Sequence, residues 1–306
     1  MGTGCLSKIK VTVVAEDSVH YGSDLLGQHG ISFFIEAWNN KTARRVLFDL
    51  GQNYHALRHN LKILGISLQD IDAVVLSHSH RDHTDGLVEL LGDIGKDNLP
   101  IIAHPDVFKT TFLNKPVLKY AGIRGKRSRN ALEQKGGQLC LSSEPFSIMP
   151  GLTTSGEIPY SLSEQERSLP IFMLDDGKVL PDPINEEIAL IARVEGSGLI
   201  ILTGCGHPGI VQITQKALSI FPGEKVEIIS GGFHLTCAGK TEVQNIGKKL
   251  ESFDPSFLLP GHCTGFEADL VLAGIFGSRF KPLYSGTEMI VSNTDGTFIS
   301  QAEEDK

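Results

Sequence analysis

The feature that most constrains this chain is the sequence Ser-His-Ser-His-Arg-Asp-His at positions 77–83. It directly follows an apolar run at 71–76, which has the length and composition of a buried strand. Residues 86–94 beyond it have helical periodicity. In α/β proteins, side chains at the C-terminal end of such a strand line the functional site. We therefore expect an α/β fold with its site at this strand-to-helix junction.

The side chains at this junction have the chemistry of a metal site. His78 and His80 are two residues apart on an extended segment and so point to the same side. Asp82 and His83 follow at the entrance of the helix and can face the same space. Three imidazoles and a carboxylate match the ligands that zinc and similar divalent ions prefer. Purely structural histidines are the weaker interpretation, because imidazoles packed together without a metal would titrate against one another.

The rest of the chain alternates short strands with helices on both sides of its midpoint. Strands are expected at 8–14, 31–38, 45–50, 188–194, 199–203 and 226–229, with a last strand at 257–259, and helices at 54–64, 210–221 and 241–253. An apolar share of 41% supplies a core and excludes a disordered chain. The repeated rhythm indicates a layered α/β sandwich in a single domain spanning residues 1–306.

Charge is distributed unevenly along the chain. The net charge is −8, which argues against a protein that coats nucleic acid. Between positions 109 and 135, however, eight Lys and Arg residues stand against one acid, Glu133. We regard about 105–140 as a basic insert. Its charge fits either a site for an anion, phosphate above all, or a solvated loop, and the pattern leaves both open.

Cysteine content and hydropathy bear on location. The five cysteines are widely spaced and include no Cys-x-x-Cys pair. This pattern disfavours a disulfide framework and favours a reducing, cytoplasmic setting. No stretch reaches the roughly 18 apolar residues of a membrane helix, so no membrane partner is expected. Nothing in the sequence indicates an oligomeric state.

The motif His-x-His-x-Asp-His after a hydrophobic strand resembles the metal motif of the metallo-β-lactamase superfamily at every ligand position. The resemblance extends from about Lys8 to the C-terminal strands, apart from the basic insert, and implies a four-layer αββα sandwich of two similar halves. The later motifs TSGEIP, LTGCGHPGI, GGFHL and PGHCTG, at 154–159, 202–210, 231–235 and 260–265, resemble one branch. Its members are similar to 7,8-dihydropterin-6-ylmethyl-4-(β-D-ribofuranosyl)aminobenzene 5′-phosphate synthase, a dihydropteroate-synthase-like enzyme of methanopterin synthesis.

This resemblance implies a binuclear metal site, with two Zn²⁺ expected and Mn²⁺ or Fe²⁺ as alternatives. His262, in the Pro-Gly-His turn, matches the C-terminal histidine ligand of the superfamily. The chain departs from the superfamily pattern twice, because Cys205 stands at the bridging aspartate and Glu157 at the middle histidine. Both thiolates and carboxylates bind zinc, so the site can survive these changes.

The residues near these two positions can have structural roles as well as functional ones. His207, two residues after Cys205, can supply the missing imidazole ligand or can cap the helix that begins at about 210. Cys205 can be a ligand or simply a buried packing residue. Glu157 can contact metal or substrate, or can be a solvated turn carboxylate. His234, which follows Gly-Gly-Phe at a strand end, fits a ligand, a general acid or a substrate contact.

Three functions remain open at this point. In a hydrolase of lactones, thioesters or phosphoesters, Asp82 would be metal ligand and proton acceptor, and His234 or His262 would protonate the leaving group. In a pterin-synthase-like enzyme, the metals would assist loss of diphosphate from an anionic pterin substrate. A non-catalytic small-molecule-binding protein on the same fold is the third. In the synthase, phosphate groups would be held by the basic insert, whose candidates are Lys119, Arg124, Lys126, Arg127 and Arg129.

Overall fold

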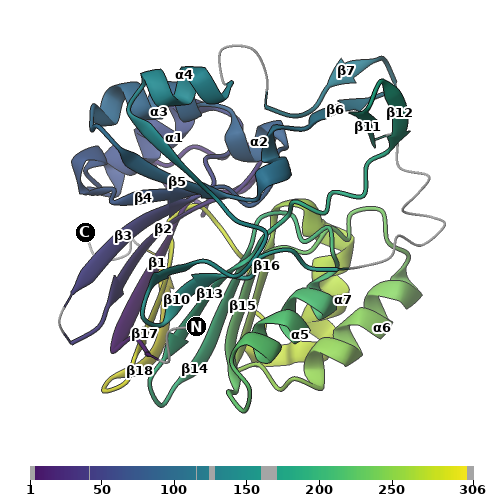
Figure 1. Cartoon of the computed structure of the whole chain (residues 1–306). Coiled ribbons are helices and arrows are strands. Elements are labelled where there is room, and N and C mark those ends of the chain that lie inside the picture. Colours follow the sequence, from purple (N-terminus) through teal and green to yellow (C-terminus); the bar gives the residue numbers. More distant parts are fainter. Residues whose placement is uncertain (1–3, 41, 115, 124–127, 160–170, 302–306) are drawn as a thin grey trace.

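The computed structural model describes residues 4–301 except for 41, 115, 124–127 and 160–170. Two large β-sheets pack face to face, and helices cover the outer face of each (Figure 1). The expected four-layer αββα sandwich is confirmed.

The first large sheet has eight strands in the order β18-β17-β1-β2-β3-β4-β5-β8. Its strands are β1 (Lys8–Ala15), β2 (Ser32–Trp38), β3 (Ala43–Phe48), β4 (Ala73–Val75), β5 (Leu99–Ala103), β8 (Gly137–Leu141), β17 (Thr287–Ser292) and β18 (Gly296–Gln301). The strands β3, β4, β5 and β8 are parallel. The strand predicted at 257–259 is present as β16 (Phe257–Gly261), but it is not the last strand, because the chain returns and adds β17 and β18 beside β1. The edge strand β18 has no buried residue, so its sequence carries little strand signal.

The second large sheet has six strands in the order β16-β15-β14-β13-β10-β9. Its strands are β9 (Ser147–Met149), β10 (Leu152–Thr154), β13 (Leu190–Val194), β14 (Gly198–Thr203), β15 (Val226–Gly232) and β16 (Phe257–Gly261). The strands expected at 188–194 and 199–203 are present as β13 and β14, which pair as an antiparallel hairpin. The strands β14, β15 and β16 are parallel, so their C-terminal ends lie at the same edge of the sheet.

Helices complete the outer layers. Those on the first sheet are α1 (Tyr54–Ile63), α3 (Leu87–Ile94) and α4 (Arg129–Gln134), and those on the second are α5 (Ile210–Ile220), α6 (Lys240–Glu251) and α7 (Phe266–Phe276). One short helix, α2 (Arg81–Thr84), lies in the histidine motif, and 3₁₀ turns are η1 (Leu68–Asp70), η2 (Pro105–Phe108), η5 (His262–Thr264) and η6 (Gly277–Arg279). Apolar side chains fill the space between the sheets and between each sheet and its helices, which is the main stabilising term of the sandwich. None of the helices in the described part of the chain has the length and apolarity to cross a bilayer.

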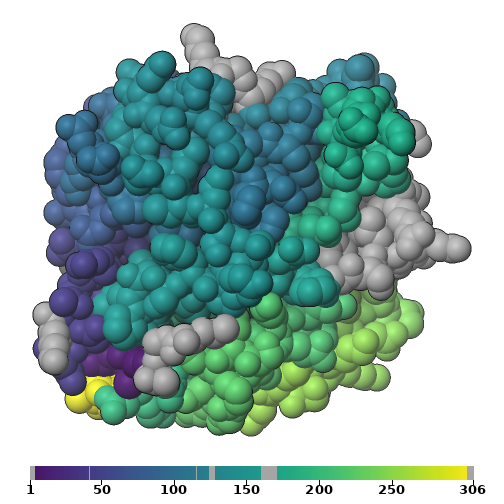
Figure 2. All heavy atoms as spheres, viewed as in Figure 1, coloured from purple at the N-terminus to yellow at the C-terminus, as the bar shows by residue number. Residues whose placement is uncertain are grey.

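A third, four-stranded sheet lies outside the sandwich and was not predicted. Its order is β12-β11-β6-β7, with β6 (Thr110–Leu113), β7 (Lys119–Tyr120), β11 (Ile171–Asp175) and β12 (Lys178–Pro181). Figure 2 shows it at the upper right of the face in view. The basic insert at about 105–140 therefore pairs with a segment near 175, whereas β8 at its end belongs to the first large sheet.

Candidate metal centre

Histidines from both halves of the sandwich meet at the C-terminal ends of their strands. His78 and His80 follow β4, and His207 lies in the Gly-rich turn between β14 and α5. One ring nitrogen from each of the three lies within 4.8 Å of the others. The ring centroids of His78 and His207 are 4.8 Å apart, and those of His80 and His207 are 5.0 Å apart. These three side chains form the first donor group.

A second donor group lies beside the first. It contains Asp82, His83, Cys205 and His262, whose donor atoms lie within 4.8 Å of one another. The Sγ atom of Cys205 is 3.2 Å from His83 Nε2 and 3.5 Å from His262 Nε2. The Oδ2 atom of Asp82 is 3.5 Å from His83 Nε2 and 3.3 Å from His262 Nε2. The rings of His78 and His83, one in each group, have centroids 4.3 Å apart, so the two groups are neighbours.

Asp49, at the end of β3, orients a histidine in each group. Its Oδ2 accepts a hydrogen bond from His83 Nδ1 at 2.7 Å and another from Ser77 Oγ at 2.6 Å. Ser77 Oγ in turn accepts from His78 Nδ1 at 2.8 Å. Both histidines therefore hold their Nδ1 proton toward a partner and leave Nε2 for the donor group. Carboxylates that fix ligating histidines in this way are usual around protein-bound metals.

Two further carboxylates act in the same way on His207 and His262. Glu187 accepts from His207 Nδ1 at 2.5 Å and also from the backbone N–H groups of 205–207. Asp17 accepts from His262 Nδ1 at 2.7 Å and from His29 Nδ1 at 2.9 Å. His29 Nε2 lies 3.4 Å from Asp82 Oδ2, so His29, which was not among the predicted site residues, borders the second group.

Burial and neighbouring charges separate the two groups electrostatically. Burial and nearby histidines lower the pKa of His78 and His207 well below the usual histidine value and lower that of His80 to about 3, so their lone pairs are free near neutral pH. Burial opposes protonation of His83 too, but the carboxylates of Asp82 and Asp49 outweigh it and raise its pKa to about 10. The first group is thus a set of neutral nitrogen donors, whereas in the second group His83 is protonated between the carboxylates of Asp82 and Asp49, and a bound cation would replace its Nε2 proton.

The residues present fit divalent cations. The Nε2 atoms of His78 and His80 are buried and make no hydrogen bond within the described residues. An unpartnered buried nitrogen is costly, and a metal ion held with His207 would satisfy both atoms. The imidazole, carboxylate and thiolate donors of the two groups are also those that zinc takes.

Backbone geometry at the centre is unusual for non-glycine residues. Asp49, His234 and His262 have φ values of 57°, 52° and 49°, in the left-handed region that costs free energy for most side chains. Gly204 allows the halves to approach, because a Cβ there would lie 2.1 Å from Ser77 Oγ. Such strain persists only where the surroundings enforce it, which is typical of functional sites.

Cys263 and His234 form a third group with Cys205, again with donor atoms within 4.8 Å of one another. Cys263 Sγ donates to the backbone oxygen of Cys205 at 3.2 Å. The His234 ring is 4.3 Å from that of His207 between centroids, so it lies at the edge of the first group. Cys263 was not a predicted site residue, although it directly follows His262 in the Pro-Gly-His-Cys turn.

The predicted substrate-binding residues lie elsewhere. Glu157 is outside the donor groups, and its carboxylate is 3.7 Å from His104 Nε2. Lys119 is exposed on β7, and the Arg129 guanidinium lies over the Phe108 ring, 4.7 Å from its centroid. The remaining three candidates, Arg124, Lys126 and Arg127, lie outside the described residues.

A buried ion network connects the small sheet to the histidine motif. The Lys109 ammonium contacts both Asp182 and Glu186, whose side chains are fully buried. Glu186 accepts a hydrogen bond from Ser79 Oγ at 2.8 Å, and Ser79 lies between His78 and His80 in the sequence. The sequence offered one signal for this network, the adjacent Glu186-Glu187 pair before a strongly apolar strand.

Replacing Glu187 with Gln is expected to weaken metal binding by about 10–100-fold, as is usual for residues that orient ligands. The amide keeps one acceptor oxygen, whereas the carboxylate accepts four hydrogen bonds from the turn that carries Cys205 and His207. Chelator competition measures the affinity. The matched control is Glu195→Gln, an exposed glutamate, and equal affinities in the two variants would contradict the assignment.

Comparisons with known proteins identify related sequences. A family model described as a β-lactamase superfamily domain matches residues 44–168. The chain is 37% identical, over 289 residues, to the 7,8-dihydropterin-6-methyl-4-(β-D-ribofuranosyl)-aminobenzene-5′-phosphate synthase of Methanocaldococcus jannaschii, with 94% of this chain and 98% of the relative covered. It is 35% identical over 244 residues to an uncharacterised protein of the same organism, covering 79% of this chain and 86% of that one.

A solved structure supports the fold. Tm1679, described as a metal-dependent hydrolase of the β-lactamase superfamily, superimposes with a TM-score of 0.75 over 93% of this chain and 100% of its own. Its sequence identity is 23%, so this likeness speaks for the shared architecture and not for a shared substrate.

Proposed function

Because the chain belongs to the metallo-β-lactamase superfamily, in the family of the dihydropterin-methyl ribofuranosylaminobenzene phosphate synthase, we propose that it is a metal-dependent enzyme that joins a dihydropterin to an aromatic ribose phosphate. The pterin substrate carries its 6-methyl group as a diphosphate ester, and the acceptor is the amine of 4-(β-D-ribofuranosyl)aminobenzene 5′-phosphate. The observation that carries the proposal is 37% identity along nearly the full length of both chains.

Two divalent ions, with zinc as the preferred metal, are assigned to the two donor groups. His78, His80 and His207 would hold one ion, and Asp82, His83 and His262 would hold the other. Cys205 Sγ lies closest to His83 and His262 and would bind the second ion, as a softer sulfur ligand in place of the aspartate oxygen of the superfamily pattern. Nitrogen, oxygen and sulfur donors together favour zinc over the harder Mn²⁺.

The proposed reaction breaks one C–O bond and forms one C–N bond. The amine nitrogen attacks the pterin methylene carbon, diphosphate leaves, and the amine loses a proton. When bound, the cations supply charge stabilisation for the departing diphosphate. Contact with Cys263 outweighs burial and raises the pKa of His234, so His234 would be the candidate to protonate the departing diphosphate. Asp82 would be the candidate to accept the amine proton as well as a metal ligand. Among the predicted basic residues, Lys119 is exposed on β7 and would be available to a substrate phosphate.

The hydrolase alternative uses the same centre with water as nucleophile. Incubating the metal-loaded protein with both substrates distinguishes the two functions, with product and diphosphate followed by chromatography. The synthase predicts condensed product and diphosphate in equal amounts. Diphosphate release without condensed product indicates a hydrolase. If no diphosphate is released and lactones and phosphoesters are not hydrolysed either, the protein is a non-catalytic binding protein.

A further inference from the structure

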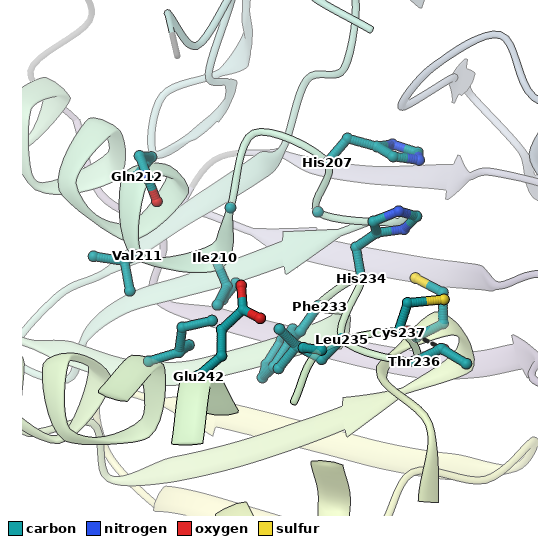
Figure 3. Close-up of a pocket in the computed structure, with 15 residues that line it drawn as sticks. His207, Ile210, Val211, Gln212, Phe233, His234, Leu235, Thr236, Cys237 and Glu242 are labelled. Atoms are coloured by element: carbon teal, nitrogen blue, oxygen red, sulfur yellow. Dashed lines mark hydrogen bonds between the residues drawn. The ribbon is translucent and has the colours of Figure 1, made fainter. Parts of the chain in front are cut away.

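A cavity of about 200 Å³ adjoins the metal centre on the α5–α6 side of the second sheet (Figure 3). It lies between the start of α5, the loop that follows β15, and α6. Its apolar lining includes Ile210, Phe233, Leu235 and Ile246. Typical ligand pockets are roughly 300–1,000 Å³, so this cavity has room for a single small ring system and not for a whole nucleotide.

The polar groups of the cavity differ between its two sides. Figure 3 shows the Glu242 carboxylate near Ile210 and Phe233, while the rings of His207 and His234 lie on the other side. Glu242 is exposed on α6, so its carboxylate can accept hydrogen bonds from a bound molecule without first losing a buried partner. The side with the histidines also includes Cys263 and borders the donor groups.

We propose that this cavity binds the dihydropterin ring of the substrate, an inference that rests on the proposed function. The 2-amino group and the adjacent ring N–H of a pterin form a paired donor edge, which a carboxylate recognises. Phe233 and the aliphatic side chains would contact the flat ring. With its donor edge on Glu242, the ring directs its 6-methylene substituent toward His234 and the metal centre, where the C–O bond breaks.

This assignment gives Glu242 a role that an ordinary surface carboxylate does not have. The test measures binding of 6-hydroxymethyl-7,8-dihydropterin to the metal-loaded protein by isothermal titration calorimetry. The probe lacks diphosphate, so its affinity reports on the ring site. Glu242→Gln is expected to weaken binding at least about tenfold, because a hydrogen bond to a charged group is lost. Glu267→Gln, which alters an exposed carboxylate on α7 outside the cavity, is the matched control and is expected to leave affinity unchanged.

A second variant, Ile246→Trp, fills the cavity and is expected to abolish probe binding. Ile246 is partly buried, so Glu242→Gln remains the deciding variant if this one fails to fold. Equal affinity in wild type, Glu242→Gln and Glu267→Gln overturns the inference, as does the absence of probe binding to wild type.

The two proposals fail in different ways. Condensation that proceeds with an unchanged KM for the pterin diphosphate in Glu242→Gln overturns the ring site and leaves the proposed function intact. Probe binding that depends on Glu242, together with no condensation by wild type, supports the ring site and overturns the synthase.

Discussion

Replacing His80 with alanine is expected to lower the rate of diphosphate release by about 10³-fold. The substitution removes one of three donors from the first group, whose other members are His78 and His207. A metal ion contributes several kcal/mol of charge stabilisation to such a step, and each 1.4 kcal/mol corresponds to tenfold in rate. Initial rates at saturating metal and substrate give the comparison.

The matched control for this loss is His55→Ala. His55 is exposed at the start of α1, outside the donor groups, and its replacement is expected to leave the rate within about twofold of wild type, as for most surface substitutions. Thermal unfolding of both variants separates loss of the metal from loss of the fold. If the His80→Ala protein folds and retains more than about a tenth of the wild-type rate, the first donor group does not contribute to the reaction as proposed.

Replacing Lys109 with Met is expected to cost about 3–5 kcal/mol of the free energy of unfolding, the usual consequence of leaving a buried charge without its partner. The side chains of Asp182 and Glu186 are both 0% exposed, and Lys109 is the cation that contacts them. Because Glu186 accepts the hydrogen bond from Ser79, the change is also expected to weaken metal binding at His78 and His80.

The stability loss in Lys109→Met has a defined pH dependence. Burial raises the pKa of Glu186 even though Lys109 lowers it, and without the lysine this pKa rises further. A carboxyl pKa that is raised in the folded state destabilises the protein once the carboxyl ionises, and protonation relieves the cost. The loss is therefore expected to shrink as the pH falls from 8 to 5. Urea unfolding of wild type and Lys109→Met across this pH range measures the stability loss, with the exposed Lys119→Met as control. A stability loss that stays constant or grows on acidification contradicts the ion network.

Much of the sandwich was predictable because its strands and helices carry strong local patterns. The buried run before the histidine motif is visible as an apolar segment, and the hairpin between β13 and β14 as two apolar segments joined by a Gly-rich turn. The small sheet was not predictable in the same way. Its pairing joins β6 to β11, about 60 residues later in the chain. The strand β12 is exposed at every residue, so no alternation of buried and exposed side chains marks it in the sequence.

The residues of the candidate site were also only partly predictable from the sequence. His78, His80, Asp82 and His83 all lie within residues 78–83, so local spacing was enough to predict a metal site there. Asp49, Asp17 and Glu187 lie outside every motif, and only the packing of distant strand ends brings them to the histidines. Carboxylates that orient ligands have no spacing rule of their own, because they approach from any element that ends nearby.

Elemental analysis of untagged protein tests the assignment of two ions most directly. Wild type is expected to hold about two zinc-class ions per chain, and His207→Ala and Cys205→Ala about one each, since each change removes a donor from one group. His55→Ala is expected to match wild type. A wild-type protein that binds no ion after reconstitution, or that keeps both ions when His207 and Cys205 are replaced, would contradict the binuclear centre described above.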